Sequence, residues 1–296
     1  LEVYYLRIQR GGEAYCERKL GAMGALLAAV SGFLDRPWSE PVPGFSAGAR
    51  GYVLNQAHLH LRALGRLPEA AEAGRECLRV REAEEDWENA ARGAGNLVYL
   101  FLASGELGQA VDAGERAVLL ADTSKLELEL VSNRAYLGAV RHFQGDLAGA
   151  SRAFAEAEQI QHDWQPTYPL LYSFRGAQYC ALLLDLGRAS NVEQRGRRFL
   201  GWRVSSDSLL DLGVEELSLG RACHLLASAD PSGADSAGLR TDAQEHLEFA
   251  LQRLREAGQQ HYLPPGLLAR ASFLRDSGDR NKALCDLNET LDLTER

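Results

Sequence analysis

A six-residue turn that recurs at constant spacing constrains the fold of this chain more than any other feature. The copies begin at Gly65, Gly105 and Gly145, read GRLPEA, GELGQA and GDLAGA, and so stand 40 residues apart. Each glycine lies between two runs with helical apolar spacing, which is typical of a left-handed glycine that ends one helix before the next begins. The sequence therefore predicts a repeated helix–turn–helix unit. One such pair cannot bury its apolar face alone, so we expect the units to stack into a solenoid.

The residues that follow each turn glycine repeat as well. A leucine stands two residues after the glycine, and a small residue stands five and twelve residues after it. Small residues allow two helices to approach closely, and we expect the leucine to fill the space beneath the turn. These positions are Leu67, Leu107 and Leu147, then Ala70, Ala110 and Ala150, then Cys77, Ala117 and Ala157.

The composition favours helices throughout the chain. Hydrophobic residues make up 46% of the 296 residues, which is sufficient for a core. The good helix formers Ala, Leu, Glu, Arg and Gln are abundant, whereas β-branched runs are few and the Asn-Gly and Asp-Gly hairpin turns are missing from the sequence. We therefore predict an all-α fold, an α/α superhelical solenoid of stacked helix–turn–helix repeats.

We expect residues 1–296 to form a single solenoid. An N-terminal helical element and a proline-rich loop would occupy 1–45, and Ser46 is a suitable N-cap for the first regular helix. The Ser-, Asp- and Gly-rich segment 228–238 is interpreted as a flexible insertion in the fifth repeat. The expected repeats span 46–83, 86–122, 126–162, 165–203, 207–257 and 264–296.

The net charge and the cysteines indicate which ligands and which cellular compartment suit this chain. The net charge of −9 at pH 7 argues against a general binder of nucleic acid or anionic membrane, because both ligands need positively charged faces. Five scattered cysteines without a Cys-x-x-Cys pair indicate small core residues in a reducing compartment. The sequence has neither a signal peptide nor an apolar run of transmembrane length. We therefore expect a cytoplasmic protein that binds neither nucleic acid nor membrane.

The pattern Gly-(Asp/Glu/Arg)-Leu-x-x-Ala, with a small residue twelve positions after the glycine, resembles the tetratricopeptide repeat (TPR). The match is good over 46–162 and looser over 165–296. The spacing of 40 residues exceeds the family's usual length of about 34, which longer helices would explain. The resemblance implies a module that binds a protein or peptide.

Four longer strings resemble the C-terminal repeat region of bacterial STAND-class signalling ATPases, which join an effector domain, a nucleotide-binding switch and a repeat sensor. This resemblance implies that the chain is the sensor of a larger protein. A phosphate-binding Gly-x-x-x-x-Gly-Lys-(Ser/Thr) loop is missing from the sequence, so the ATPase would lie outside this chain. The strings are RIQRGGE at 7–13, DWENA at 86–90, QPTYPLLYS at 165–173 and LPPGLLARA at 263–271.

The sequence contains no recognisable pattern of a catalytic or metal site. His58 and His60 are two residues apart, which places them on nearly opposite sides of a helix, so they cannot chelate one metal ion. The Gly-x-Ser-x-Gly and His-Glu-x-x-His motifs do not occur. We therefore predict a protein that is not an enzyme and that carries no metal and no cofactor.

The TPR resemblance also implies where a ligand binds. In that family the first helix of each pair lines a concave groove, and positions three and six before the turn glycine point into it. The resemblance implies a groove with a basic rim and an apolar floor, suited to an acidic peptide because guanidinium groups bind carboxylates. Asn96 stands where the family carries an asparagine that binds peptide backbone. The candidate binding residues are Arg62, Arg92, Asn96, Tyr99, His142, Arg221, His224 and Arg275.

A second interpretation is that these residues are ordinary exposed polar side chains that bind no ligand, because arginine is common throughout this chain. The favoured function is a non-catalytic protein- or peptide-binding module, the sensor or interaction domain of a larger bacterial signal-transduction protein. Two alternatives stay open: a free-standing TPR scaffold or co-chaperone, and the ligand-sensing domain of a transcription regulator. An upstream phosphate-binding loop would favour the first function, and an upstream helix-turn-helix the last. The oligomeric state is open.

Overall fold

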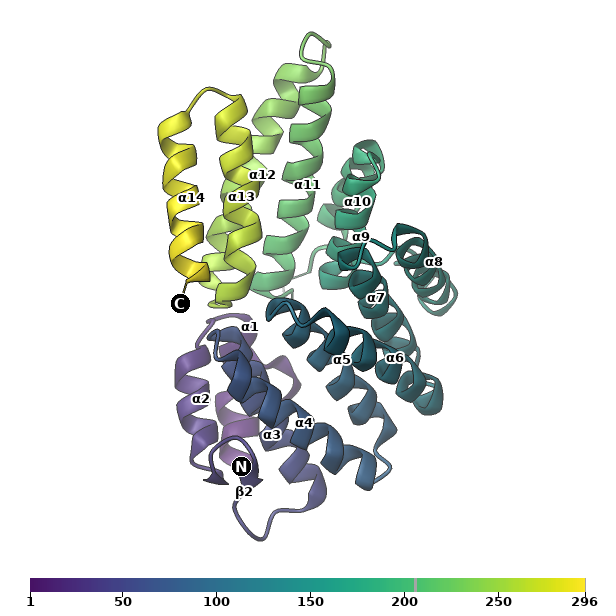
Figure 1. Ribbon diagram of the computed structural model, residues 1–296, viewed down its shortest axis with the longest axis vertical. Coiled ribbons are helices and arrows are strands. Elements are labelled where there is room, and N and C mark those ends of the chain that lie inside the picture. The colour runs from purple at the N-terminus through teal and green to yellow at the C-terminus, as the bar shows by residue number, and fades with distance from the viewer. Residues whose placement is uncertain (205–206, 296) are drawn as a thin grey trace. The chain divides into compact units, whose positions relative to one another are not determined.

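The computed structural model describes residues 1–204 and 207–295 and confirms the predicted all-α fold of stacked helical hairpins (Figure 1). Among the described residues, a single short antiparallel pair of strands, β1 (Leu34–Arg36) and β2 (Glu40–Pro41), interrupts the helices. This pair lies in the predicted proline-rich loop. The chain is therefore an α-helical repeat protein.

The contacts within the chain divide it into two compact units. Unit 1 comprises Leu1–Gly11 and Ala22–Leu171, and unit 2 comprises Gly12–Gly21 and Tyr172–Arg296. Each unit is described separately below. The prediction of one continuous solenoid over 1–296 stays a prediction.

Unit 1 contains three consecutive helical hairpins, each made of two helices of similar length that pack against each other. The hairpins are α3 with α4, α5 with α6, and α7 with α8. A short N-terminal helix, η1, and helix α2 precede them. The bounds are η1 Val3–Ile8, α2 Met23–Ser31, α3 Ala47–Ala63, α4 Leu67–Ala83, α5 Trp87–Ala103, α6 Leu107–Ser124, α7 Glu127–Phe143 and α8 Leu147–Trp164.

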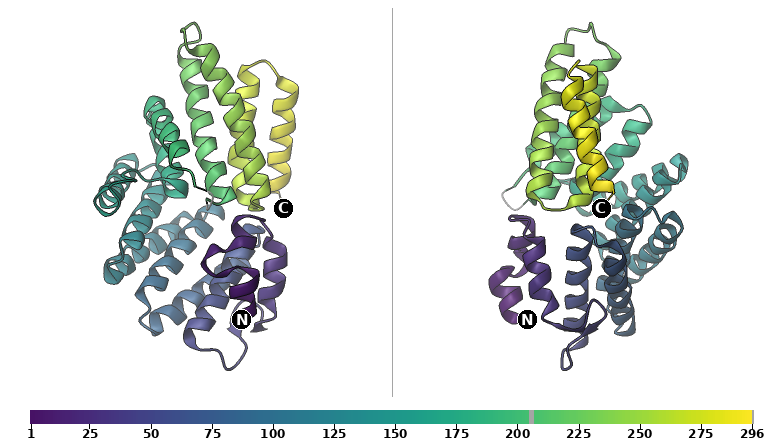
Figure 2. Two further views of the ribbon diagram at one scale, coloured as in Figure 1. Left: turned by 180° about the vertical axis from the view of Figure 1, so that it is seen from behind. Right: turned by 60° about the vertical axis from the view of Figure 1, so that its left-hand side comes forward.

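Unit 2 contains a shorter hairpin, α9 with α10, followed by the long pair α11 with α12 and the final pair α13 with α14. The two long helices lie side by side in both views of Figure 2. The short helix η2 (Gly11–Glu13) spans the division between the units. The remaining bounds are α1 Tyr15–Arg18, α9 Ser173–Asp185, α10 Ala189–Trp202, α11 Leu209–Ala229, α12 Ser236–Glu256, η3 Gln260–Tyr262, α13 Leu263–Asp276 and α14 Arg280–Thr294.

The recurring turn has the geometry that its sequence predicts. In the first copy, Gly65 has a φ of +77°, its N–H donates to the carbonyl of Arg62, and the next N–H donates to the carbonyl of Leu61. This pattern is the Schellman motif, which satisfies the last carbonyls of a helix and favours glycine because the residue adopts the left-handed region. The equivalent glycines at positions 105, 145, 187 and 278 have positive φ values as well.

The small residues of the repeat are buried as predicted, but the turn leucines are not. Ala70, Ala110, Ala150, Cys77, Ala117 and Ala157 are all buried. Leu107 and Leu147, by contrast, are exposed. Each is the first residue of its helix, so its side chain projects over the turn rather than into the core. The expectation that the turn leucines fill the space beneath the turn was therefore wrong for Leu107 and Leu147, whereas Leu67 is half-buried.

A different leucine joins one hairpin to the next, and the sequence pattern did not reveal it. A Cβ placed on Gly74 of α4 would lie 2.7 Å from Cδ2 of Leu97 on α5, so the two helices approach as closely as glycine allows. Gly114 meets Leu137 of α7 in the same way, and Gly196 meets Leu219 of α11. These glycines stand nine residues after their turn glycines, so the packing between hairpins repeats with the sequence.

Two local predictions have definite outcomes. Ser46 caps α3 as expected, because its side chain accepts a hydrogen bond from the N–H of Ala49. The predicted insertion at 228–238 is shorter than expected: α11 extends to Ala229 and α12 begins at Ser236. Ser236 is buried, and its hydroxyl donates to the carbonyl of Ala227 at 3.4 Å. Side-chain burial therefore orders residues that composition alone assigned to a loop.

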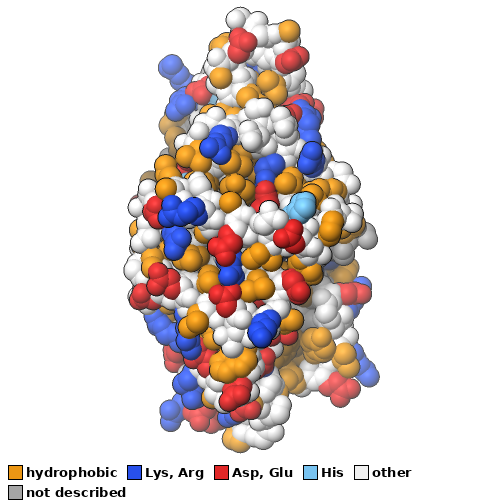
Figure 3. Space-filling model, turned by 90° about the vertical axis from the view of Figure 1, so that its right-hand side faces the viewer, with side chains coloured by type: hydrophobic (Ala, Val, Ile, Leu, Met, Phe, Trp, Pro, Cys, Tyr) orange, Lys and Arg blue, Asp and Glu red, His pale blue; other side chains and the backbone are white. Residues whose placement is uncertain are grey.

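Surface charge is mixed on the face drawn in Figure 3, where acidic and basic side chains alternate with apolar ones. Within residues 1–204 and 207–295, no helix has the length and apolar character needed to cross a membrane. Of the five cysteines, Cys77, Cys180 and Cys223 are buried, Cys16 is half-buried and Cys285 is exposed. The expectation that all five are core residues was therefore wrong for Cys285.

Candidate functional site

The candidate residues fall into two groups, one in each unit. Unit 1 holds Arg62, Arg92, Asn96, Tyr99 and His142, and unit 2 holds Arg221, His224 and Arg275.

In unit 1 the candidates cross-link the first helices of neighbouring hairpins. Arg62 of α3 is only 8% exposed, and its Nη1 donates to the carbonyl of Asn96 on α5 at 3.3 Å. The side chain of Asn96 reaches back, with its Nδ2 donating to Oδ1 of Asn55 at 3.2 Å. The guanidinium of Arg62 also lies 5.8 Å from the ring centre of Tyr99. These contacts hold α3 against α5.

A second set of contacts joins α5 to α7. Arg92 donates through Nη2 to carboxylate oxygens of both Glu88 and Glu129, each at 2.9 Å. The Tyr99 ring packs edge-on against Tyr136 of α7, with ring centres 4.5 Å apart. His142 lies near the end of α7 with its ring 6.0 Å from that of Phe143.

The unit 1 candidates therefore do not form the exposed basic rim that was expected. One guanidinium, that of Arg62, is buried, and the other, that of Arg92, is neutralised by two carboxylates. The physical reason is the close spacing of the first helices, which lets a long side chain on one helix reach acceptors on the next. A charge that is already paired gains little from a ligand carboxylate.

In unit 2 the three candidates line one pocket. Arg221 and His224 come from α11 and Arg275 comes from α13, and the pocket between these helices has a volume of about 500 Å³. We call it the α11–α13 pocket. Its apolar lining includes the exposed side chains of Leu225 and Leu268. The other lining residues are Ser228, Pro265, Ala269, Ser272 and Asp276.

The guanidinium of Arg221 is the least compensated charge in this pocket. Arg221 is half-buried, and no described residue forms a hydrogen bond or an ion pair with its side chain. Burial lowers the pKa of this guanidinium, while the more distant charge of Asp185 opposes that effect. A partly desolvated guanidinium offers five N–H donors in a planar fork, which makes an anion a favourable partner.

The other two candidates are linked through Asp276. Nε2 of His224 lies 3.1 Å from Oδ2 of Asp276, and Nε of Arg275 donates to Oδ1 of the same carboxylate at 2.8 Å. The bond from Arg275 holds the pKa of Asp276 below its usual range. The charge of the ionised Asp276 offsets one of the two arginine charges, and one positive arginine charge is left over. The pocket therefore suits a single carboxylate better than a densely charged anion.

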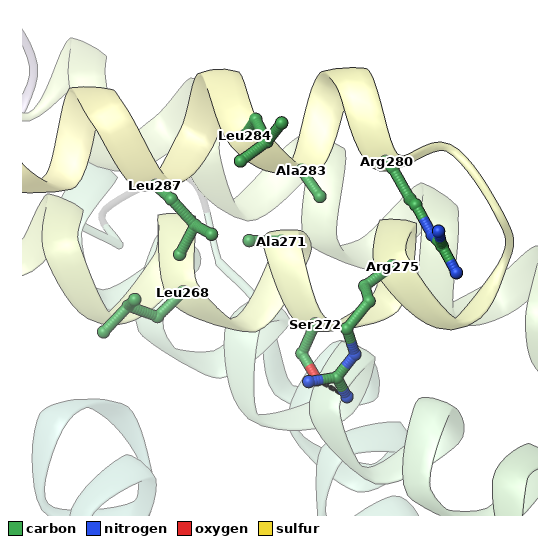
Figure 4. Close-up of a pocket in the computed structure, with 8 residues that line it drawn as sticks. All are labelled: Leu268, Ala271, Ser272, Arg275, Arg280, Ala283, Leu284 and Leu287. Carbon is green, nitrogen blue, oxygen red and sulfur yellow. Dashed lines mark hydrogen bonds between the residues drawn. The ribbon is translucent and has the colours of Figure 1, made fainter.

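A second pocket lies on the other side of α13. This α13–α14 pocket has a volume of about 460 Å³ and shares Leu268, Ser272 and Arg275 with the first. Figure 4 shows its two ends: leucine side chains gather at one end, and Arg275 and Arg280 lie at the other. The lining also includes Ala271, Ala283, Leu284 and Leu287. Residues of α13 thus line both apolar pockets, and arginine is among the lining residues of each.

Sequence reasoning missed Arg280 and the pocket leucines. No sequence motif singles them out: Leu268 lies on α13, and Leu284 and Leu287 lie three residues apart on one face of α14. Their exposed fractions are 49%, 56% and 43%, and no further described helix covers them. Helical spacing shows that Leu284 and Leu287 share a face, but it does not show whether that face is covered.

Neither pocket has the features of a metal centre. Among the described residues, no three His, Cys, Asp or Glu side chains are placed to hold a metal ion. A buried acid lies elsewhere, on α11: Glu216 pairs with Nη1 of Arg203 at 2.7 Å and contacts His246. These charges bond to one another, so the cluster joins α11 to its neighbours.

Comparisons with known proteins assign no family. No protein-family model matches the chain, and no curated protein matches it. One solved structure that resembles it is the crystal structure of BtubC (BKLC) from P. vanneervenii, with a TM-score of 0.40 and 13% sequence identity. The similarity covers 93% of this chain and 91% of that one. At this TM-score, the resemblance carries no weight for fold or function.

Proposed function

We propose that this chain is a non-catalytic protein-binding module of the tetratricopeptide-repeat type, and that its α11–α13 pocket receives a carboxylate of a bound peptide. One observation carries the proposal: Arg221 is half-buried in an apolar pocket and has no hydrogen-bond or ion-pair partner among the described residues. A carboxylate would satisfy its guanidinium with two parallel hydrogen bonds.

The apolar lining supports a peptide rather than a free ion. Leu225 and Leu268 flank the arginines, and the α13–α14 pocket extends the apolar surface across Arg275 and Ser272. Peptide recognition commonly combines apolar anchors, which supply affinity, with a few polar groups, which fix orientation. A segment with a leucine-sized side chain beside an Asp or Glu fits this combination.

The proposal of a TPR module within a larger signalling protein rests on the sequence resemblances. The turn pattern and small-residue positions support a TPR module, and the four STAND-like strings support the sensor or interaction region of a larger bacterial signal-transduction protein, acting in the cytoplasm. The alternative with a structural argument in its favour is a ligand-sensing domain, because a pocket of about 500 Å³ also suits a small carboxylic acid.

Selection of peptides on the intact chain tests the proposal. A phage-displayed library of random linear peptides is selected on the protein, the enriched peptides are synthesised with a fluorophore, and affinity is measured by fluorescence anisotropy. We expect enriched peptides to carry Asp or Glu next to a large apolar residue. In the variant that combines Arg221→Ala with Arg275→Ala, we expect their affinity to fall at least about tenfold, because hydrogen bonds to charged groups are lost.

The matched control is Arg240→Ala, which removes one exposed arginine of α12 that lines neither pocket. This variant should bind the peptides as the wild type does. Unchanged affinity in the double variant, or enrichment of peptides without acidic residues, would refute the proposal. Binding of free succinate at the two arginines with no enriched peptide would instead favour the ligand-sensing alternative.

A further inference from the structure

The last helix carries an apolar stripe that no described part of the chain covers. Leu284, Leu287 and Leu291 are 56%, 43% and 54% exposed. Their spacing of three and four residues places them on one face of α14. Arg280 extends this face at the start of the helix and Glu295 extends it at the end. We call these five residues the α14 stripe.

The α14 stripe differs from the surfaces that α4, α6 and α10 present to the following hairpin. Leu287 stands nine residues after the turn glycine at position 278. In α4, α6 and α10 the corresponding residue is glycine, and a leucine of the following hairpin rests on it. A leucine side chain at that position prevents an equally close approach. The stripe is therefore not shaped for the leucine-on-glycine contact of those three junctions.

The charges at the two ends of the stripe complement each other. Arg280 and Glu295 are exposed, and the side chain of each lacks a hydrogen bond or ion pair to any other described residue. One end of the stripe is thus basic and the other acidic. A second copy of α14 laid antiparallel on the first would place each Arg280 opposite a Glu295. The same register sets each Leu284 opposite a Leu291, with the two Leu287 side chains near the axis.

A parallel arrangement would bring like charges together at both ends, which opposes association. The antiparallel arrangement is also self-complementary, as a two-fold axis requires, because the same patch serves both copies. We therefore propose that two copies of this chain associate through their α14 stripes, antiparallel, about a two-fold axis near Leu287.

The neighbouring α13–α14 pocket strengthens this inference. Leu268 of α13 lies next to Leu287 in Figure 4, so leucine side chains of a second copy can enter an apolar recess rather than rest on a flat surface. Burial of exposed leucines on both copies favours association. The interface is small, so we expect a dimer that dissociates on dilution. None of the five stripe residues lines the α11–α13 pocket, so loss of dimerisation can be distinguished from loss of the carboxylate contact at Arg221.

Sedimentation velocity over a series of protein concentrations tests the association. The wild type should shift from monomer to dimer as concentration rises. Leu287→Glu should raise the dissociation constant at least about tenfold, because two carboxylates would meet at the axis. The matched control is Leu119→Glu, which changes an exposed leucine of unit 1 that is 55% exposed, against 43% for Leu287. Circular dichroism checks that both variants retain the helical content of the wild type.

Charge reversal tests the orientation. Arg280→Glu alone and Glu295→Arg alone should each weaken the dimer, because each creates two repulsive pairs. The variant with both reversals restores opposite charges and should recover most of the wild-type affinity. Arg240→Glu on α12 is the control for net charge and should have no effect.

Each contrary result overturns a defined part of the inference. A wild type that stays monomeric at every concentration refutes self-association. A dimer that survives Leu287→Glu uses a different surface. A double charge reversal that restores nothing excludes the antiparallel register.

Discussion

Replacing Glu215 with glutamine should stabilise unit 2, and the gain should grow as pH rises. Glu215 of α11 is only 8% exposed. Its Oε1 accepts a hydrogen bond from the N–H of Ser173 at 2.8 Å, and its Oε2 lies 4.0 Å from Nε of Arg203. Burial raises the pKa of this carboxyl from its usual 4.5 to about 7, because the charged form loses hydration.

The direction of this pKa shift decides whether folding stability rises or falls with pH. The folded form holds the Glu215 proton more tightly than the unfolded chain, so stability is complete below pH 4.5 and is lost as pH rises through 7. When the carboxyl is ionised in both the folded and the unfolded chain, a pKa shift of this size corresponds to a loss of about 3 kcal/mol in the free energy of unfolding. Glutamine carries no charge and can still accept the bond from Ser173. We therefore expect the advantage of Glu215→Gln to grow by about 2 kcal/mol between pH 5 and pH 8.

The assay must report on unit 2 alone, because a chain with two units need not unfold in one step. Guanidinium unfolding followed by pulsed hydrogen exchange and mass spectrometry meets this need, since peptides from α11 and α12 are read separately from those of unit 1. Glu245→Gln, an exposed glutamate of α12, is the matched control. A Glu215→Gln variant whose advantage is the same at pH 5 and pH 8, or that is less stable at both, would show that the carboxylate is compensated in the fold.

Two further predictions concern unit 1. Burial lowers the pKa of His58 from 6.5 to about 4, so the stability of unit 1 should be complete above pH 6.5 and fall by up to about 3 kcal/mol as pH drops through 4. His58→Gln should flatten this profile for exchange of α3 peptides, and an unchanged acid profile would contradict the assignment. Gly74→Ala should destabilise unit 1 by about 1–3 kcal/mol although alanine favours helix, because the new Cβ would lie 2.6 Å from Nδ1 of His58. Gly93→Ala is the control, since its Cβ meets nothing within 4 Å, and should be neutral or stabilising; equal effects of the two substitutions on urea unfolding would disprove the close contact.

The repeat made much of the fold predictable. The turn glycines specify where helices end, because few other residues adopt positive φ without strain, and Ser46 marks where a helix begins. Composition misjudged the segment 228–238, where the burial of Ser236 against α11 extends both helices. Ser, Asp and Gly signal a loop only when no tertiary contact orders them.

The candidate site was predictable in part. The register from the turn glycine identified Arg221, His224 and Arg275, and these three line one pocket. The same register identified Arg62, and Arg92 was added as a residue one helical turn from Asn96; both arginines instead bond to neighbouring helices. Position on a helix shows which face a side chain occupies. It does not show whether a partner for that side chain stands within reach, because the partner comes from another repeat.

The sequence by itself determined the secondary structure, the hairpin turns and the small residues of the core, because each depends on backbone preference or on spacing within one helix. Only the tertiary structure decided which arginine keeps an uncompensated charge, which glycines lie beneath a leucine of the next hairpin, and which leucines stay exposed on α14. Those properties depend on distances between helices that are far apart in sequence. A repeat pattern specifies the helical hairpin, but it does not specify which charged and polar side chains meet between neighbouring hairpins.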